Sequence, residues 1–309
     1  MKKPSKYLIV IAGPTAVGKS DLALFLAEWL STEIISADSR QIFRQMNIGT
    51  AKPEPHDLQR VRHHFINELD INQSFTASAF EEEALCRIES IFQKKQVAIM
   101  CGGTGLYINA VTHGLDQIPD VGMEIREKYD QQYRDEGIES LQILLKNLDL
   151  EYAEKVDLSN HRRLIRALSV IEATGEKFSS FLSRKPKTRP FKSINILLTE
   201  DRQVLYQRID QRVDQMIGNG LEDEVYQLLA FQDLQALQTV GYQEWFPYFT
   251  GSRKFEEVIR LIKRNSRRYA KRQSTWFRKY GKWEPFSNRE YANIQAYVSK
   301  QIASPTQNT

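Results

Sequence analysis

The chain has 309 residues and a mass of 35.9 kDa, and with 41% hydrophobic residues it can bury a substantial core, which excludes disorder as its main state. Its 43 Lys and Arg against 39 Asp and Glu give a net charge of +4, which suits an acidic partner but excludes a histone-like protein. The two cysteines, Cys86 and Cys101, exclude a disulfide framework and a four-cysteine zinc site. We expect a cytoplasmic protein without a membrane span, because no apolar run near the start approaches the ~20 residues needed and no signal-peptide pattern follows it.

Short runs rich in β-branched residues alternate with a helical segment. The runs 8–11, 33–36 and 97–100 have the composition of buried parallel strands, and a fourth run, 194–198, comes much later. Residues 21–30, between the first two runs, are good helix formers. Alternation of strands and helices favours a parallel sheet with right-handed crossovers. The sequence therefore predicts an α/β fold.

A phosphate-binding motif follows the first predicted strand. Residues 13–20 fit G-x-x-x-x-G-K-[ST] and precede a predicted helix, which is the context that the motif requires. Its glycines let backbone N–H groups converge on an anion, Lys19 supplies a cation, and Ser20 can hold Mg²⁺. The motif predicts a core like that of the P-loop NTPases and a bound di- or triphosphate. It is typical of nucleotide-binding and ATP-binding proteins, but it does not by itself prove ATP.

Two polar residues are expected beside this loop. A typical P-loop ATPase has an acidic residue after a later strand, whereas here the strand 97–100 runs into Cys101-Gly102-Gly103-Thr104. Asp38 instead follows the second strand, at the carboxyl edge where ligands bind in open parallel sheets. Thr104 is expected at the same edge, and a tight turn is the alternative interpretation of the glycine-rich stretch 102–105. We expect Asp38 to face the phosphate site, and a turn or helix-capping acid is the alternative interpretation.

The strand pattern disappears between 114 and 190. This segment is helical and charged and ends in a basic stretch punctuated by proline, so we interpret it as a mainly α-helical insertion domain. The alternative is a run of ordinary surface helices. The expected domains are 1–113 and 191–285 for the two parts of the core, 114–190 for the insertion, and 286–309 for a C-terminal tail.

A basic segment lies near the end of the core. Residues 253–282 contain twelve Lys and Arg and two acidic residues. Two rows repeat every four residues and would form one positive stripe on a helix: Arg260, Arg264, Arg268, Arg272 and Lys263, Arg267, Lys271. With interleaved aromatic residues, such a stripe suits a nucleic-acid backbone, and a solvated helix with an aromatic inner face is an equal alternative. His63 and His64 lack a third metal ligand, so we interpret them as structural.

Six motifs in this order resemble the bacterial tRNA dimethylallyltransferases, and the match spans about residues 8–280. They are GPTAVGKS (13–20), ISADSRQIF (35–43), NIGTAKP (47–53), GGTGLY (102–107), TVGYQE (239–244) and AKRQSTWF (270–277). The resemblance implies transfer of the dimethylallyl group from dimethylallyl diphosphate to N6 of the adenosine 3′-adjacent to the anticodon, in tRNAs that read codons beginning with U. Diphosphate is released, so the P-loop holds a prenyl diphosphate rather than ATP, with Mg²⁺ as the cofactor.

The resemblance also implies roles for individual residues. Asp38 is the base that orients the adenine amine and takes its proton, and Thr104, Thr15 and Arg212 surround the diphosphate. The diphosphate loop comprises Gly13, Pro14, Thr15, Ala16, Val17, Gly18, Lys19 and Ser20, and Ser20 holds Mg²⁺ through the diphosphate. The residues implied for tRNA are Asp38, Ser39, Arg40, Gln41, Thr104, Arg126, Arg162, Arg163, Leu164, Ile165, Arg166 and Gln243, with the residues that follow it to 248.

The sequence departs from the family within the insertion. Where many members have Asp-Pro and Pro-Asn-Asp, this chain has Leu150-Glu151-Tyr152 and Leu158-Ser159-Asn160-His161. We therefore expect a different local geometry at 150–161 and the same reaction. The expected partners are the tRNA anticodon stem-loop and dimethylallyl diphosphate, and the chain is expected to be a monomer.

Two other functions remain open at this point. A small-molecule or nucleotide kinase would share the P-loop and the α/β core, and ATP-dependent phosphorylation would identify it. A non-enzymatic RNA-binding module would share the basic surfaces but has no use for an acidic residue that faces a P-loop. Neither alternative accounts for all six motifs.

Overall fold

The structure is a computed structural model, and it describes residues 5–182 and 186–303. The chain divides into two compact units. The core unit contains the described residues up to 113 and those from 188 onward, and the insertion unit contains the described residues from 114 to 187. Residues 183–185, part of the basic stretch expected to close the insertion, lie outside the described residues, as do 304–309 of the expected tail.

The core unit is built on a six-stranded sheet in the order β3-β2-β4-β1-β5-β6, and every pair of neighbours is parallel. The strands are β1 (Tyr7–Ala12), β2 (Ile34–Ser36), β3 (His63–His64), β4 (Val97–Gly102), β5 (Lys192–Thr199) and β6 (Glu284–Ser287). The predicted α/β fold is confirmed. The sequence did not predict β3 and β6, because these short edge strands lack a run of β-branched residues, and β6 contains a proline, which only an edge strand tolerates.

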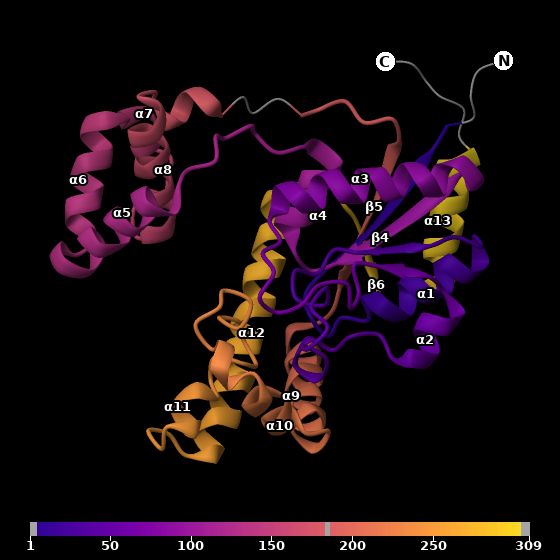
Figure 1. The fold of residues 1–309 in the computed structure, drawn as a ribbon. Coiled ribbons are helices and arrows are strands. Elements are labelled where there is room, and N and C mark those ends of the chain that lie inside the picture. The colour runs from indigo at the N-terminus through magenta and orange to yellow at the C-terminus, as the bar shows by residue number, and fades with distance from the viewer. Residues whose placement is uncertain (1–4, 183–185, 304–309) are drawn as a thin grey trace. The chain divides into compact units, whose positions relative to one another are not determined.

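Helices cover both faces of the sheet (Figure 1). Alternate residues of β1 point to opposite faces. Leu8 and Val10 join a hydrophobic cluster with α3 and α4, whereas Ile9 and Ile11 join another with α1 and α13. The helices of the core unit are α1 (Lys19–Trp29), η1 (Ile48–Thr50), α2 (Pro55–Arg60), α3 (Ala77–Lys94), α4 (Gly105–His113), α9 (Arg202–Gly218), α10 (Leu221–Gln227), η3 (Leu229–Phe231), α11 (Phe246–Phe249), α12 (Phe255–Lys279) and α13 (Tyr291–Ala303).

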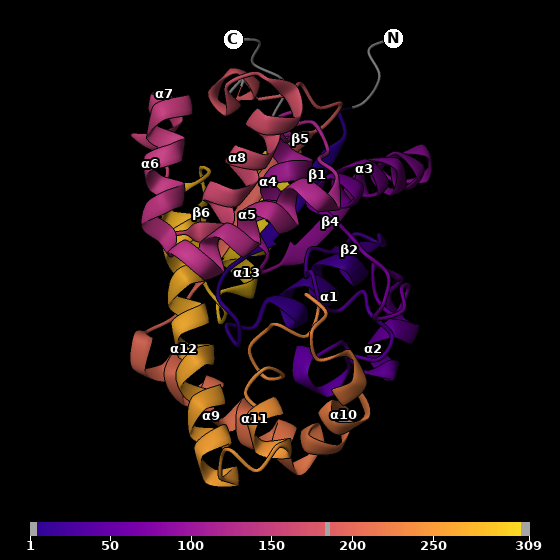
Figure 2. The same ribbon diagram turned by 60° about the vertical axis from the view of Figure 1, so that its left-hand side comes forward.

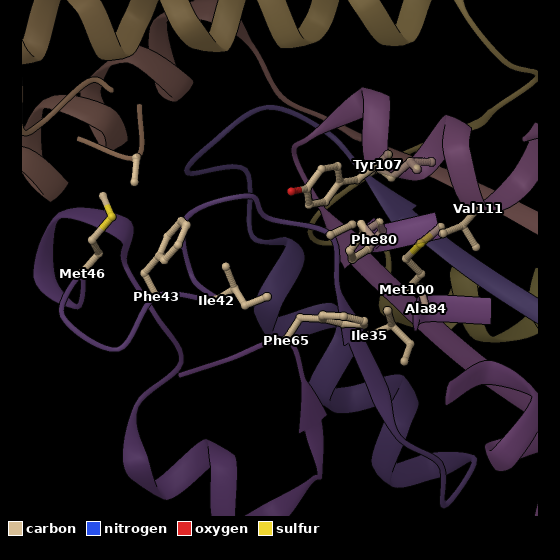
Figure 3. Packing of buried hydrophobic residues seen from close by; sticks show 14 of the residues in the cluster. Ile35, Ile42, Phe43, Met46, Phe65, Phe80, Ala84, Met100, Tyr107 and Val111 are labelled. Carbon is tan, nitrogen blue, oxygen red and sulfur yellow. The ribbon is translucent and has the colours of Figure 1, made fainter. Parts of the chain in front are cut away.

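An aromatic cluster anchors the segment that follows β2 (Figure 3). The rings of Phe80 on α3 and Tyr107 on α4 stack with centroids 4.1 Å apart, and Phe65 packs against Phe80 at 4.9 Å. Ile42 and Phe43, which come soon after Asp38, are buried in the same hydrophobic cluster. Burial of these two side chains holds the segment next to the carboxyl edge of the sheet.

The insertion unit is a small helical bundle, visible in Figure 2 as α5 to α8. Its helices are α5 (Met123–Glu136), α6 (Ile138–Leu148), α7 (Leu150–Ala153), α8 (His161–Thr174) and η2 (Phe178–Phe181). The fully buried Asp149 accepts hydrogen bonds from the Tyr152 and Ser179 N–H groups and from the Ser179 hydroxyl, and Asn160 caps α8. The segment that departs from the family is therefore organised by two side-chain caps.

The expectation of a C-terminal tail from 286 onward is wrong for the described residues. β6 extends to Ser287 and pairs with β5, and α13 follows it. Ile294 and Val298 are fully buried against the face of the sheet that carries Ile9. One turn of helix separates these two residues, and the partly buried Tyr291, Tyr297 and Ile302 of the same helix pack against the same cluster.

Ile294→Ala is expected to lower the free energy of unfolding by about 2 kcal/mol, because it leaves a cavity between α13 and the sheet. Gln301→Ala changes an exposed residue of the same helix and should alter the free energy of unfolding by less than about 0.5 kcal/mol. Urea unfolding followed by circular dichroism measures both. Equal stabilities of the two variants would mean that α13 contributes nothing to the folded core.

No helix within residues 5–182 and 186–303 is both long enough and apolar enough to cross a membrane.

Candidate active site

The phosphate loop connects β1 to α1 and ends where the first turn of α1 begins. Gly18 is the N-cap of α1 with φ +98°, a left-handed conformation that favours glycine. A Cβ on Gly13, which has φ +150°, would lie 2.7 Å from the backbone oxygen of Leu198. The loop therefore needs both glycines to bring its N–H groups and the N-terminus of α1 around one point.

Lys19 lies across this loop, with its Nζ donating to the Pro14 carbonyl at 2.7 Å. The pKa of Lys19 is lowered to about 8, mainly by burial and also by the nearby Arg212, while Cys101 and Asp38 oppose this shift. A bound anion would favour the protonated form. Lys19 is thus a partly buried cation that diphosphate would stabilise.

Asp38 lies at the carboxyl end of β2, where the sequence predicted it. Its Oδ1 accepts the backbone N–H groups of Arg40 at 2.9 Å and Gln41 at 3.3 Å. The carboxylate also lines a cavity together with Thr15 and Arg212. The sequence offered two interpretations of Asp38, a residue that faces the phosphate site or an acid that caps a turn. The structure is compatible with both, because Asp38 accepts N–H groups of its own turn and lines the same cavity as Thr15.

Thr104 braces the turn that carries Asp38. Its Oγ1 accepts the Ser39 N–H at 3.2 Å, and its own N–H donates to the Ala37 carbonyl at 3.1 Å. A Cβ on Gly102 would lie 2.2 Å from the same carbonyl oxygen, so glycine is required by this close approach. The end of β4 therefore holds the end of β2 in place.

Arg212 reaches the phosphate loop from α9. Its Nη1 donates to the Thr15 hydroxyl at 3.1 Å. Burial lowers the pKa of Arg212, whereas Asp21 and Asp38 raise it. The structure thus brings together Thr15, Arg212 and Asp38, which lie far apart in the sequence.

Gln273 of α12 is a site residue that sequence reasoning missed. Its Oε1 accepts the Thr15 N–H at 2.9 Å, and its Nε2 donates to the Gly103 carbonyl at 3.0 Å. Only 7% of the residue is exposed. The signals available in the sequence were an amide within a basic helix and its place in the motif at 270–277. Gln273 links the phosphate loop to the loop after β4.

Gln273→Glu should weaken diphosphate binding about tenfold, because a carboxylate cannot donate to the Gly103 carbonyl and adds negative charge beside the loop. Gln301→Glu adds the same charge at an exposed position of α13 and serves as the control. Calorimetric titration with diphosphate and Mg²⁺ measures both. Equal affinities for the two variants would contradict the linking role of Gln273.

The cavity beside these residues has a volume of about 410 Å³. Thr15, Asp38 and Arg212 form its polar end. Part of the remaining wall is apolar and comes from α9 and α12: Ile209, Val213, Met216 and Ile262. The rest of the wall includes Gly49, Thr50 and the segment 238–243. The cavity offers an anion-binding end next to an apolar surface.

The remaining residues implied for tRNA in the core unit have mixed roles. Ser39, Arg40 and Gln243 line the cavity. Gln41 instead stabilises the segment around residues 50 and 51, because its Nε2 donates to the backbone oxygens of Thr50 and Ala51 at 3.3 and 3.2 Å.

The residues implied in the insertion unit divide by exposure. Arg162, Arg163 and Arg166 are exposed on α8, and Arg126 is exposed on α5, where it pairs with Asp120 at 3.2 Å. Leu164 and Ile165 are 0% and 5% exposed and pack in the hydrophobic core of the unit. Their side chains therefore support α8 instead of offering a contact surface.

The basic stripe of α12 is partly neutralised. Lys263 pairs with Asp214 at 2.6 Å and Arg267 with Asp210 at 2.5 Å, so this row faces α9. Arg260 pairs with Glu257 on its own helix. The exposed cations of the helix's second half are Arg268, Lys271, Arg272, Arg278 and Lys279. The positive surface is thus shorter than the sequence predicted.

Oxygen ligands suitable for Mg²⁺ lie at the start of α1. Ser20 and Asp21 are exposed in its first turn, next to the loop. Mg²⁺ keeps several waters and binds through few protein oxygens plus phosphate, so this donor set fits it. Across 5–182 and 186–303, no group of three or more His, Cys, Asp or Glu residues could hold a metal ion. His64 instead bonds to Glu33 at 2.7 Å.

Comparison with known proteins gives a consistent result. A family model described as IPP transferase matches residues 41–280. The chain is 47% identical over 300 residues to a tRNA dimethylallyltransferase of Christiangramia forsetii, covering 96% of this chain and 99% of that protein. It is 43% identical to a tRNA dimethylallyltransferase of Cytophaga hutchinsonii, covering 96% and 98%.

Solved structures agree in fold. A tRNA isopentenylpyrophosphate transferase from Bacillus halodurans superposes with a TM-score of 0.72 at 36% identity, covering 96% of this chain and 97% of that chain. A eukaryotic dimethylallyltransferase acting on tRNA gives a TM-score of 0.82 at 26% identity, covering 98% of this chain and 81% of that chain.

Proposed function

The chain belongs to the IPP transferase family of tRNA dimethylallyltransferases, and we propose that it transfers a dimethylallyl group from dimethylallyl diphosphate to N6 of the adenosine 3′-adjacent to the anticodon, in tRNAs that read codons beginning with U. The observation that carries the proposal is one cavity lined by Thr15, Asp38 and Arg212 beside the phosphate loop. The relatives give no support to the kinase alternative. An RNA-binding module without activity leaves Asp38 unexplained.

The phosphate loop binds the leaving group in this proposal. As the allylic C–O bond breaks, its electron pair stays on the diphosphate, so cations and N–H donors at that point stabilise the transition state. The loop N–H groups, Lys19, Thr15 and Arg212 are suited to this role. The apolar wall from α9 and α12 suits the hydrocarbon group.

Asp38 acts on the acceptor. The exocyclic amine of adenine is a weak nucleophile, and a carboxylate within hydrogen-bond reach can orient it. When the N6–C bond forms, one N6 proton passes to Asp38 and the other remains on the product. The turn that fixes Oδ1 favours this role, because it limits the rotation of the carboxylate.

Mg²⁺ is the cofactor in the proposal, and Ser20 would hold it through the diphosphate. The ion supplies positive charge against the departing anion.

The adenosine must leave the base stack to reach Asp38, as in other enzymes that act on a base. Ser39, Arg40 and Gln243 are proposed to contact it or its neighbours, because they line the cavity. The exposed arginines of the insertion unit, Arg126, Arg162, Arg163 and Arg166, are proposed to bind tRNA phosphates. We further propose that the chain works as a monomer in the cytoplasm, and light scattering of the purified protein tests the first point.

The decisive experiment uses unmodified anticodon stem-loop RNA, dimethylallyl diphosphate and Mg²⁺ without ATP. Mass spectrometry should detect the gain of one dimethylallyl group, and nuclease fragments should locate it on the adenosine beside the anticodon. RNA in which that adenosine is replaced by guanosine is the matched control. No gain with dimethylallyl diphosphate, together with phosphorylation when ATP is supplied, would overturn the proposal in favour of a kinase.

A further inference from the structure

A carboxylate with four hydrogen-bond donors holds two of the segments that line the cavity. Glu224 of α10 accepts the N–H groups of Asn47, Ile48 and Gly49 at 3.0, 2.7 and 3.1 Å. It also accepts the hydroxyl of Tyr242 at 2.7 Å. One side chain therefore joins α10 to two segments that are almost 200 residues apart in the sequence.

The two segments also touch each other closely. A Cβ on Gly49 would lie 2.5 Å from the ring of the fully buried Tyr242, so only glycine permits this approach. Burial, and after it the carboxylate of Glu224, raise the pKa of Tyr242, so its hydroxyl stays protonated as a donor. Removing the Glu224 acceptor would leave several N–H groups and a buried hydroxyl without this partner.

The same segments form the acceptor side of the cavity. Gly49, Tyr242 and Gln243 line the same cavity as Thr15, Arg212 and Asp38. A second carboxylate fixes the turn, since Glu244 accepts the Gly241 N–H at 2.9 Å and the amide of Asn265 at 2.7 Å. The side-chain hydrogen bonds of Glu224 and Glu244 go to residues 47–49, Gly241, Tyr242 and Asn265, and none of these residues belongs to the phosphate loop.

We propose that Glu224 is a positioning residue for RNA: it holds residues 47–49 and Tyr242 in register and so shapes the wall against which the flipped adenosine lies. The inference rests on the proposed function. It assigns the prenyl donor and the RNA to opposite ends of one cavity, with Glu224 affecting only the RNA end.

The test compares Glu224→Gln with Asp223→Asn, which removes the same charge from an exposed neighbour on α10. Loss of one negative charge should by itself favour RNA binding, so Asp223→Asn should leave the KM for the stem-loop unchanged or lower it. Glu224→Gln should raise that KM about tenfold, because displacement of the wall misplaces the base. Its KM for dimethylallyl diphosphate should stay within about twofold of the wild type.

Tyr242→Phe provides a second variant, since it removes one donor of the Glu224 cluster and keeps the ring. Its KM for RNA should rise in the same direction by a smaller factor, and thermal melting should show that it folds. Equal KM values for RNA in Glu224→Gln and Asp223→Asn would overturn the inference. If Glu224→Gln does not fold, a folded Tyr242→Phe with wild-type KM values would overturn it instead. Failure of the wild type to prenylate RNA would instead refute the proposed function.

Discussion

Asp38→Asn is expected to lower kcat for prenyl transfer by about three orders of magnitude, as is typical when a positioned general base is removed. The asparagine oxygen can still accept the N–H groups of Arg40 and Gln41, so the turn should keep its shape. The amide cannot take the proton that N6 loses as the new bond forms. Rapid-quench measurements with saturating stem-loop RNA and dimethylallyl diphosphate give kcat directly.

Binding of the diphosphate separates this effect from misfolding. Asp38→Asn should bind diphosphate at least as tightly as the wild type, because it removes a negative charge next to Lys19 and Arg212. Asp223→Asn removes a carboxylate at an exposed position of α10 and should retain most of the activity. A kcat for Asp38→Asn within about tenfold of the wild type would rule out general-base catalysis by this residue.

Lys19→Met should reduce kcat/KM for dimethylallyl diphosphate by about 10²- to 10³-fold, the range found when one preorganised donor to a developing anion is lost. Lys19 lies in the phosphate loop, where it donates to the Pro14 carbonyl. Methionine retains much of the buried hydrocarbon chain, so the variant should fold. Steady-state kinetics with radiolabelled dimethylallyl diphosphate measures the change, and a loss below about fivefold would exclude Lys19 from the diphosphate site.

The lowered pKa of Lys19 also predicts a pH dependence. Its pKa is about 8 in the folded chain against an ordinary value of 10.5, so the unfolded chain binds more protons between these two values. The contribution of Lys19 to stability should therefore rise with pH from about 8 to 10.5 in the unliganded protein. Diphosphate favours the cation, so its binding above pH 8 should be accompanied by proton uptake and should weaken as pH rises.

Calorimetry in two buffers of different ionisation enthalpy detects that proton uptake. Burial also lowers the pKa of Lys52 to about 8, so the stability of the wild type alone cannot assign the effect. The difference in pH dependence between the wild type and Lys19→Met isolates the contribution of Lys19. If both proteins take up the same number of protons on binding diphosphate, the coupling does not involve Lys19, and diphosphate itself or another group accounts for it.

The sequence predicted those strands whose own residues form a recognisable apolar run, and it missed the elements that lack one. The strands around Val10, Ile35 and Ile99 are buried on both faces, so each is a run of apolar residues that can be identified without the fold, and β5 still shows an apolar run at 196–198. The edge strands β3 and β6 and the helix α13 have no such run. The two strands are placed by pairing with β2 and β5, and α13 is placed by the apolar residues that it packs against the sheet, of which Ile294 and Val298 are fully buried.

The sequence by itself determined the α/β class, the phosphate loop and the edge of the sheet where Asp38 lies. These features follow from residues that are neighbours in the chain, since a glycine-rich loop between strand and helix binds an anion wherever it occurs. Tertiary structure alone decided that Arg212 and Gln273 both reach Thr15 and that Glu224 joins Tyr242 to residues 47–49. Such contacts depend on how distant segments pack, because a helix has several faces and only its neighbours select the one that meets the site.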